Sequence, residues 1–355
     1  MKALVTGGAG FIGSHLVDLL ISKDLKVVVV DNFSTGRKSN LDHLADNDQL
    51  EIVELDISTD PRLNELATDA DYIFHIAALA DIVPSVQNPE LYYQSNVTGT
   101  LKVLQAARLS KNLKKFVYAA SSSCYGIPDN YPTNEEAEIR VEYPYALTKR
   151  MGEEMVLHWG KLYDLPVITT RFFNVYGPRS RTSGTYGAVF GTFLAQKLAG
   201  SPYTVVGDGK QTRDFIFVKD LVSALYKLAG SEIKDEAFNI GSGTPNSVNR
   251  LVELLGGEIT YIPKRPGEPD CTHANIEKVL AAVDWKPKTS FEQGVQIMLD
   301  NIDYWSKAPV WTPETIEKET KPWFEALGKE LRGNYVNTQC LYYWWSRLCG
   351  SKTCS

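Results

Sequence analysis

A glycine cluster close to the first residue constrains the fold of this chain more than any other feature. The motif Gly-Ala-Gly-Phe-Ile-Gly at residues 8–13 follows the apolar residues 3–5 and opens a stretch with helical spacing of apolar side chains, residues 11–20. A second apolar run, residues 27–30, ends at Asp31, 18 residues after the last glycine of the motif. Glycines at such a turn let a pyrophosphate approach the helix N-terminus, and the carboxylate can accept hydrogen bonds from a ribose. This context favours a dinucleotide site over the alternative that the glycines only shape a tight turn, and a dinucleotide site is therefore predicted.

Asp31 and its neighbours also bear on which dinucleotide binds. A carboxylate at this place repels a 2′-phosphate, and the next residue is Asn32 rather than an arginine, so the sequence favours NAD over NADP. Arg37 and Lys38 lie close by in the sequence and keep NADP open as the alternative.

Apolar runs and helical patterns alternate over the first half of the chain. The further apolar runs are residues 51–55, 72–75, 116–119 and 166–169, and the helical patterns include residues 96–109 and 145–163. Strands that alternate with helices predict an α/β fold with a Rossmann-type, doubly wound parallel sheet.

The alternation stops near residue 178, which sets the expected domain boundaries. We expect an NAD-binding Rossmann domain at residues 1–178, with a later segment near residues 213–241 returning to it. Residues 179–305 are expected to form mainly a smaller, mixed α/β substrate-binding domain, and residues 306–355 a C-terminal extension of unknown role.

Local signals predict several elements after this boundary. We expect a helix at residues 189–198 and a strand pair that brackets the glycines of residues 207–209. Thr312 as cap and Pro313 at the first helical position predict a helix over residues 312–327. An aromatic stretch, residues 340–345, has no role in the expected catalytic site.

Composition and charge narrow the classes of protein. The 355 residues are 43% hydrophobic and 23% charged, as in ordinary globular proteins, and 37 Lys and Arg against 43 Asp and Glu leave no reason to expect nucleic acid as a partner. No apolar run approaches the ~20 residues of a membrane span. Residues 1–5 lead straight into the glycine cluster, so we expect no signal peptide and a cytoplasmic location.

The cysteines give no reason to expect a metal or a disulfide framework. Their number, five, is odd, and three of them, Cys340, Cys349 and Cys354, fall in the last 16 residues. Their spacing fits no common zinc pattern, so no metal is expected.

Three polar groups in the middle of the chain have a pattern suited to proton transfer. Tyr145 and Lys149 lie four residues apart on an expected helix and therefore on one face. A tyrosine is a poor base at neutral pH, but a neighbouring ammonium favours its phenolate. Ser121 to Ser123 end an expected strand, where ligands bind in such sheets. Either feature alone is common on solvated helices and loops, whereas together, after a dinucleotide motif, they indicate a catalytic site.

The set of motifs resembles the extended short-chain dehydrogenase/reductase family and, within it, the nucleotide-sugar epimerases of the UDP-glucose and UDP-N-acetylglucosamine 4-epimerase kind. The likeness extends from Met1 to about Trp305 and rests on residues 6–14, 31–36, 121–126, 145–149, 171–178 and 213–215. The resemblance implies a homodimer that associates through two helices per subunit, at residues 96–109 and 145–163.

The resemblance also implies roles for individual residues. The catalytic group would be Tyr145, Lys149 and Ser121. The residues that would bind NAD are Gly7, Gly10, Phe11, Ile12, Gly13, Asp31, Asn32, Phe33, Ser34, Thr35, Gly36, Asp56, Ile57, Ala77, Ala80, Asn96, Tyr145, Lys149 and Phe173. Those that would bind a nucleoside-diphosphate sugar, with a UDP-sugar favoured, are Ser122, Ser123, Asn174, Val189, Thr204, Val206, Arg213, Arg265, Glu268 and Thr272.

The implied reaction inverts a sugar at C4 through a 4-keto intermediate and regenerates NAD. Two positions depart from relatives of this kind. Ala80 stands where many 4-epimerases carry a lysine, and Cys124 stands where dehydratases and glucuronate decarboxylases carry a glutamate. Without that acid or base, loss of water is disfavoured.

The implied substrate depends mainly on Thr272, which aligns with a bulky tyrosine in epimerases that exclude N-acetylated sugars. Its small side chain favours UDP-N-acetylglucosamine and UDP-N-acetylgalactosamine, with UDP-glucose and UDP-galactose as further candidates, unless it only packs locally. A uronic acid would need an added cation, which Arg179 or Arg181 could supply. The alternatives kept open are a 4,6-dehydratase, a uronate 4-epimerase, a 3,5-epimerase and a non-catalytic NAD-binding sensor.

Overall fold

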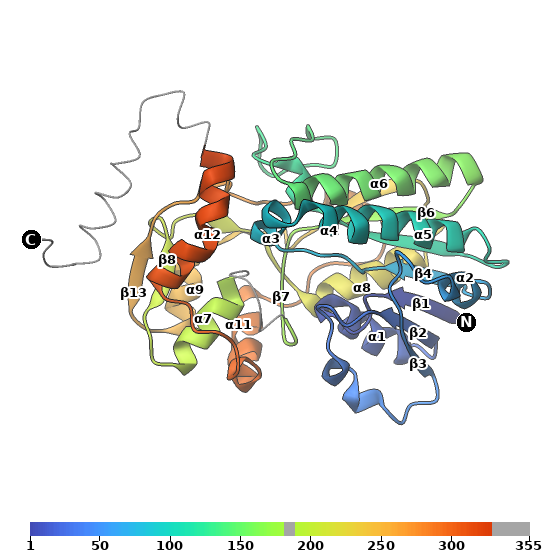
Figure 1. Cartoon of the computed structure of the whole chain (residues 1–355), viewed down its shortest axis with the longest axis horizontal. Coiled ribbons are helices and arrows are strands. Elements are labelled where there is room, and N and C mark those ends of the chain that lie inside the picture. The colour runs from blue at the N-terminus through green and yellow to red at the C-terminus, as the bar shows by residue number, and fades with distance from the viewer. Residues whose placement is uncertain (181–188, 329–355) are drawn as a thin grey trace, which may run out of the picture.

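A parallel sheet forms the larger part of the molecule. The computed structural model describes residues 1–180 and 189–328, and within them seven strands follow the order β11-β6-β5-β4-β1-β2-β3 (Figure 1). The strands are β1 (Lys2–Thr6), β2 (Lys26–Asp31), β3 (Leu50–Glu54), β4 (Tyr72–His75), β5 (Lys115–Ser121), β6 (Val167–Phe172) and β11 (Glu236–Ile240). Strand order reverses between β1 and β4, so the crevice that such sheets use for ligands opens at the carboxyl ends of these two strands.

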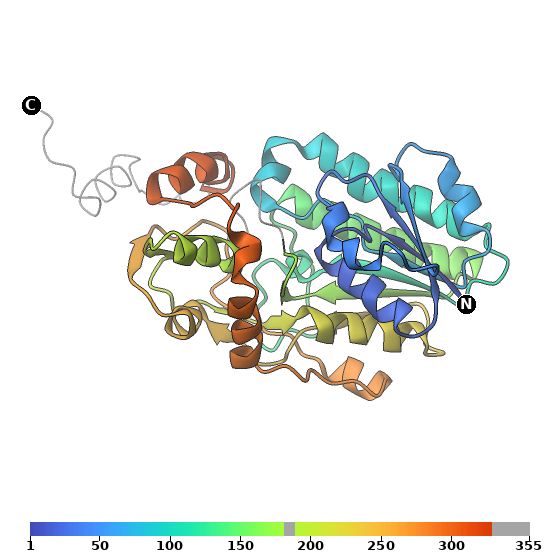
Figure 2. The same cartoon turned by 90° about the horizontal axis from the view of Figure 1, so that it is seen from below.

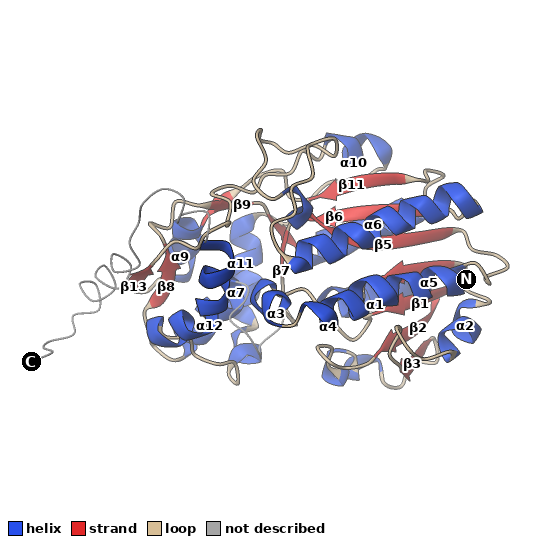
Figure 3. Ribbon diagram, turned by 45° about the horizontal axis from the view of Figure 1, so that its top comes forward, coloured by secondary structure: helices blue, strands red, loops and turns tan. Residues whose placement is uncertain are grey.

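Helices cover both faces of this sheet. Successive residues of a strand point to opposite faces, and apolar side chains stand on both. Val27 and Val29 of β2 pack with the helices of one face, and Val28 and Val30 pack with those of the other. The first face carries α1 (Phe11–Ile21), α8 (Val218–Ala229) and α10 (Glu277–Ala282), and the second carries α2 (Arg62–Ala67), α5 (Gly99–Ala107) and α6 (Pro144–Tyr163) (Figure 3). This doubly wound architecture confirms the predicted fold class.

A smaller lobe packs beside the carboxyl ends of the strands (Figures 1 and 2). It consists of short strands in pairs, with helices around them: β7 (Asn174–Tyr176) with β10 (Phe215–Phe217), β9 (Thr212–Arg213) with β12 (Asn246–Ser247), β8 (Tyr203–Val206) with β13 (Ile259–Ile262), and the helices α7 (Val189–Leu198), α9 (Val248–Leu255), α11 (Phe291–Asp300) and α12 (Pro313–Leu327). Its core is aromatic: the rings of Tyr176 and Phe190 stack with centroids 4.6 Å apart, and Phe215 stacks on Phe291 at 5.2 Å.

The prediction of a strand pair around residues 207–209 was wrong in its pairing. β8 ends before these residues, but it pairs in parallel with β13, whereas β9, which follows the turn, pairs with β12. Tyr203 and Val205 of β8 belong to the same apolar cluster as the buried residues of α9, the helix that leads into β13, and Tyr203 Oη donates to Gly256 O just after that helix at 2.9 Å. These contacts favour a partner distant in the sequence over the adjacent strand.

The helix predicted at residues 312–327 is α12. Thr312 caps it by accepting a hydrogen bond from the backbone N–H of Thr315, and Pro313 is its first residue. The residues of the expected extension beyond 328, with the aromatic stretch and its cysteines, lie outside the described residues.

Short helical segments complete the two lobes. They are α3 (Ile82–Gln87), α4 (Pro89–Tyr93), a π-helical turn (Gln94–Thr98) and the 3-10 turns Lys38–Asn40, Asp42–Leu44, Ser122–Tyr125 and Ile302–Trp305. Across the described part of the chain, no helix combines the length and the hydropathy that crossing a bilayer requires.

Candidate active site

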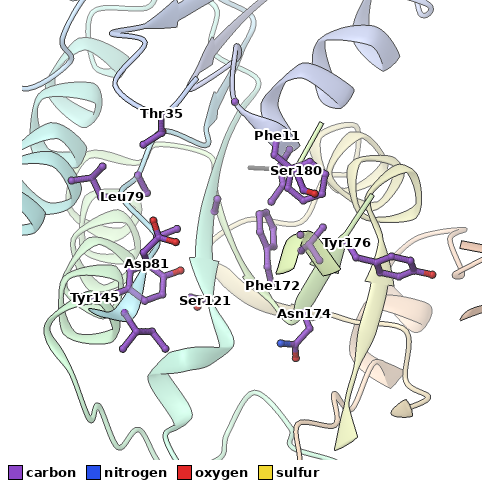
Figure 4. Close-up of a pocket in the computed structure, with 18 of the residues that line it drawn as sticks. Phe11, Thr35, Leu79, Asp81, Ser121, Tyr145, Phe172, Asn174, Tyr176 and Ser180 are labelled. Atoms are coloured by element: carbon purple, nitrogen blue, oxygen red, sulfur yellow. The ribbon is translucent and has the colours of Figure 1, made fainter. Parts of the chain in front are cut away.

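A cavity of about 660 Å³ opens at the carboxyl ends of the sheet strands, and residues of both lobes line it. Figure 4 shows Tyr145 and Asp81 entering it from one wall, Asn174 from the opposite wall, and Ser121 between them. The glycine turn, Tyr145 and Arg213 all contribute to its lining.

The glycine turn forms one end of the cavity. Gly7 has φ +71°, a left-handed conformation that favours glycine, and its N–H donates to Val30 O at 2.7 Å. A Cβ on Gly13 would lie 2.1 Å from Gly7 O, so helix α1 can start this close to the turn only with glycine there. The backbone at this helix N-terminus is left accessible, as pyrophosphate binding requires.

Asp31 lies at the end of β2 beside this turn. Its carboxylate accepts hydrogen bonds from the backbone N–H groups of Ala9 at 3.0 Å and Phe33 at 2.8 Å. Burial raises the pKa of Asp31, and these two bonds oppose the rise. The carboxylate is held in one orientation at the cavity wall, where a ribose diol would reach it. The glycine cradle and this acid fit an NAD molecule.

The proton-transfer group lies deeper in the cavity. Tyr145 and Lys149 project from consecutive turns of α6, and Ser121 is the last residue of β5. Burial raises the pKa of Tyr145, a hydrogen bond with Ser121 lowers it, and the charge of Asp81 raises it. Burial lowers the pKa of Lys149 to about 7, while the charge of Glu153 raises it. The phenol and the amine thus have pKa values shifted by the same dry environment, as in many catalytic sites.

Two arginines and a glutamate form the far end of the cavity. Arg213 of β9 donates from Nη2 to Glu268 Oε1 at 2.9 Å, and Arg265 Nε lies 3.5 Å from Glu268 Oε2. The two guanidinium charges lower the pKa of Glu268, against the effect of its burial. Both guanidinium groups line the cavity, and their fork of donors suits the oxygens of a diphosphate.

Most residues that the sequence nominated line this one cavity. They are Gly7, Gly10, Phe11, Ile12, Gly13, Asp31, Asn32, Ser34, Thr35, Asp56, Ile57, Ala77, Ala80, Ser121, Ser122, Ser123, Tyr145, Lys149, Phe173, Asn174, Val189, Thr204, Val206, Arg213, Arg265 and Glu268. These residues come from positions up to 261 apart in the chain, and the fold brings them to one crevice.

Four nominated residues lie behind the wall instead. Phe33 and Gly36 flank the Asp31 carboxylate, and the Asn96 amide bonds the backbone of Leu79 in both directions, at 2.8 and 3.0 Å. Thr272 donates to Asn174 Oδ1 at 2.7 Å, which orients that amide toward the cavity. These side chains support the groups that line the wall.

Two further positions discussed from the sequence have defined surroundings. Arg179 lines the cavity and donates to Asp18 Oδ2 at 2.8 Å, and Arg181 lies outside the described residues. Cys124 is 1% exposed and packs with Tyr125, Phe173 and Ala274, and burial raises the pKa of its thiol to about 12. It does not line the cavity and offers no acid or base to a ligand there.

Sequence reasoning missed several residues of the wall. Asp81 follows Ala80 in the loop after β4, and its place after a strand end was a signal that could have found it. Trp311 and Trp323 come from the segment beyond the resemblance, where no local pattern marked them. Asp81 lies near Tyr145, Trp323 lies beside Arg265, and the backbone of Trp311 bonds Gln196.

The comparisons with known proteins agree with this geometry. The model of the family described as NAD dependent epimerase/dehydratase matches residues 3–241. UDP-glucose 4-epimerase of Mycolicibacterium smegmatis is 35% identical over 304 residues, which cover 83% of this chain and 96% of that protein. The solved structure of UDP-N-acetylglucosamine 4-epimerase from Methanobrevibacter ruminantium M1, in complex with UDP-N-acetylmuramic acid, has a TM-score of 0.79 at 34% identity and covers 84% of this chain and 98% of its own. UDP-glucuronic acid 4-epimerase from Bacillus cereus, in complex with UDP-glucuronic acid and NAD, has a TM-score of 0.79 at 30% identity, with 85% and 99% covered.

Proposed function

Because the chain belongs to the NAD-dependent epimerase/dehydratase family, we propose that it epimerises a nucleoside-diphosphate sugar at C4, with UDP-N-acetylglucosamine and UDP-N-acetylgalactosamine as the favoured pair. Membership confirms the resemblance found in the motifs and makes the chain an NAD-dependent enzyme. The observation that carries the proposal is one cavity lined by the glycine turn at one end, by Tyr145 and Ser121 in the middle, and by Arg213 and Arg265 at the other end.

The residues of the cavity divide the chemistry between them. NAD, held at the glycine turn and Asp31, would supply reversible hydride acceptance at C4. Tyr145, as phenolate, accepts the proton of the C4 hydroxyl, and Ser121 hydrogen-bonds the same oxygen. The ammonium of Lys149, one turn along α6, favours the phenolate. Tyr145, Ser121 and Lys149 act on the oxygen at C4 whichever face the sugar ring presents.

Inversion requires that the sugar turn over while the nucleotide stays bound. Asn174, Arg213 and Arg265 would hold the diphosphate far from the reacting carbon. Binding energy placed there leaves the sugar free to present either face after its oxidation to the 4-keto form. The buried thiol of Cys124 supports epimerisation over dehydration or decarboxylation, since those reactions need a carboxyl group at that position.

The sugar end of the cavity supports an uncharged sugar. Thr272 does not line the cavity, and its hydroxyl donates to Asn174 Oδ1, so this position acts on an N-acetyl group through the orientation of the Asn174 amide. Asp81 places a negative charge beside Tyr145 (Figure 4). A carboxylate at this point accepts hydrogen bonds from sugar hydroxyls and repels the carboxylate of a uronic acid. Asp81 therefore favours neutral hexoses over glucuronate.

The Asp81→Asn variant is expected to narrow the preference for uncharged sugars. The ratio of kcat/KM for UDP-N-acetylglucosamine to that for UDP-glucuronate should fall about 10-fold, equal to about 1.4 kcal/mol, because the repulsion is lost. Loss of the charge also lowers the pKa of Tyr145, so the acidic limb of the pH profile of kcat should move to lower pH. Asp81→Glu keeps the charge and is the control. Equal use of both sugars by the unmodified protein would contradict this role.

The reaction itself is tested by product analysis. We expect the purified protein to convert UDP-N-acetylglucosamine to its C4 epimer without added NADH, as followed by proton NMR across UDP, GDP, CDP and dTDP sugars. A 4-keto-6-deoxy product would identify a dehydratase instead. No conversion of any sugar nucleotide would reject the epimerase proposal and favour a non-catalytic NAD-binding protein.

The proposal includes a homodimer. Of the two helices that the family resemblance nominates for association, the second exposes Leu147 and Leu162, and Leu109 is exposed at the end of the first. Leu91 and Tyr93 are exposed on α4, which packs against α6. Large exposed apolar side chains of this kind suit contact with a second copy of the chain.

A further inference from the structure

Helix α12 lies outside the catalytic scheme, yet it reaches the cavity. It begins at Pro313, well beyond residue 241, where the match to the family model ends. Its buried residues Ile316, Thr320 and Trp323 are spaced by four and three positions and so form one face. Trp323 lines the cavity, as does Trp311 just before the helix.

The buried face of α12 holds the turn that carries Arg265. Trp323 Nε1 donates to Pro266 O at 2.9 Å, and the Arg265 guanidinium carbon lies 5.4 Å from the Trp323 ring centroid. The next residue, Gly267, lies beside Leu327: an added Cβ would be in ordinary van der Waals contact with its Cδ1, 3.4 Å away. Three consecutive residues of the turn thus rest on the last two turns of α12.

The position of Trp323 bears on the direction of the Arg265 side chain. Arginine loses rotamer entropy when it is fixed in one direction, and a ring beneath the guanidinium reduces what is lost on binding. The Trp323 ring centroid lies 5.4 Å from the guanidinium carbon, and Glu268 Oε2 lies 3.5 Å from Arg265 Nε. Arg265 is therefore oriented before a ligand arrives.

The helix is itself anchored from two directions. It packs against α3, whose Ile82 and Val83 also line the cavity, and Figure 2 shows the two helices side by side. Just before α12, Trp311 O accepts a hydrogen bond from Gln196 Nε2 at 2.8 Å, and the same amide donates to Thr204 Oγ1 at 2.9 Å. The support for Arg265 thus connects both lobes.

We propose that α12 is part of the nucleotide-diphosphate site and that Trp323 is a positioning residue for Arg265. This inference rests on the proposed function, because it takes the ligand of Arg265 to be the diphosphate of a nucleotide sugar. Trp323 makes no contact with the reacting carbon in this scheme. Its loss therefore weakens nucleotide binding and leaves the chemical step intact.

The test measures binding of UDP and turnover of UDP-N-acetylglucosamine separately. Trp323→Ala is expected to raise the Kd for UDP, by isothermal calorimetry, and the KM for the sugar nucleotide about 10-fold, while kcat changes less than about 3-fold. Trp323→Phe keeps an aromatic ring and should recover most of the affinity. Lys318→Ala, on the exposed face of the same helix, is the matched control and should behave as the unmodified protein.

A double-mutant cycle with Arg265→Ala separates positioning from general support of the fold. If Trp323 acts through Arg265, Trp323→Ala adds less than about 2-fold to the Kd of the Arg265→Ala variant. Additive effects, or a lower melting temperature with unchanged Kd, would overturn the inference. UDP binding without turnover of any sugar would reject the proposed function alone, whereas absence of UDP binding by the unmodified protein would reject both.

Discussion

The Tyr145→Phe variant is expected to lower kcat for epimerisation by about 10²–10⁴-fold, the contribution typical of a positioned general base. Phenylalanine fills the same space on α6 but cannot accept the C4 hydroxyl proton. The diphosphate end of the cavity is unchanged, so the Kd for UDP should stay within about 2-fold. Initial rates measured by NMR and UDP binding measured by calorimetry give the two values.

Tyr143 supplies a matched control for this variant. Its ring stacks beside that of Tyr145, with centroids 6.4 Å apart and planes 8° from parallel, but it does not line the cavity. Tyr143→Phe should therefore retain most of the kcat. Comparable losses in the two variants would mean that removal of any hydroxyl here disturbs the site, and Tyr145 would lose its assigned role.

The Glu153→Gln variant is expected to lower the free energy of unfolding by about 3–5 kcal/mol, the cost of breaking a buried ion pair by removing one partner. Glu153 of α6 is 1% exposed and accepts from Arg171 of β6, with Nη2 to Oε1 at 2.7 Å and Nε to Oε2 at 2.9 Å. Arg171 also donates to the Tyr125 hydroxyl at 2.6 Å. Without the carboxylate, a buried guanidinium charge is left uncompensated. Urea denaturation at pH 7 measures the loss.

The next residue of α6 is the control for this prediction. Glu154 is exposed and pairs with Arg150 at 2.9 Å, so Glu154→Gln should change the free energy of unfolding by no more than about 1 kcal/mol. An effect of Glu153→Gln no larger than this would show that the Arg171 charge finds other compensation.

The loss in Glu153→Gln should also depend on pH through Lys149. The pKa of Lys149 is about 7 in the fold against 10.5 for the free side chain. Burial of this amine therefore lowers the free energy of unfolding below pH 7, and this loss shrinks as the pH rises from 7 to 10.5. Glu153 raises this pKa, and its removal lowers it further. We therefore expect the stability loss to be largest below pH 7 and smaller toward pH 10. A loss independent of pH would argue against coupling of the two side chains.

Local features were the part of the molecule that the sequence could predict. The glycine turn with Asp31 and the cap of α12 by Thr312 each depend on residues a few positions apart or in one βαβ unit, and each can be recognised without the fold. Parallel pairing could be predicted for the large sheet because apolar runs alternate with helical patterns in the first half of the chain. The short strands β8 and β9 have no such pattern around them, and each pairs with a strand that is distant in the sequence.

Contacts between distant residues account for what was missed. Trp323 meets Pro266 across 57 positions, and Thr272 meets Asn174 across 98. No periodicity relates such pairs, so neither the support for Arg265 nor the place of Thr272 behind the wall could be inferred. Asp81 is different, since a charged residue in the loop that follows a strand is visible in the sequence.

The contact between α12 and the cavity has a consequence for the order in which the protein becomes competent during synthesis. Ribosomes deliver the chain from its N-terminus, so the glycine turn and Asp31 emerge first and Trp323 among the last described residues. A nascent chain that already holds its dinucleotide cradle still lacks one wall of the cavity. Sugar-nucleotide binding thus becomes complete only once nearly all of the described chain has been made, which separates cofactor loading from substrate capture in time.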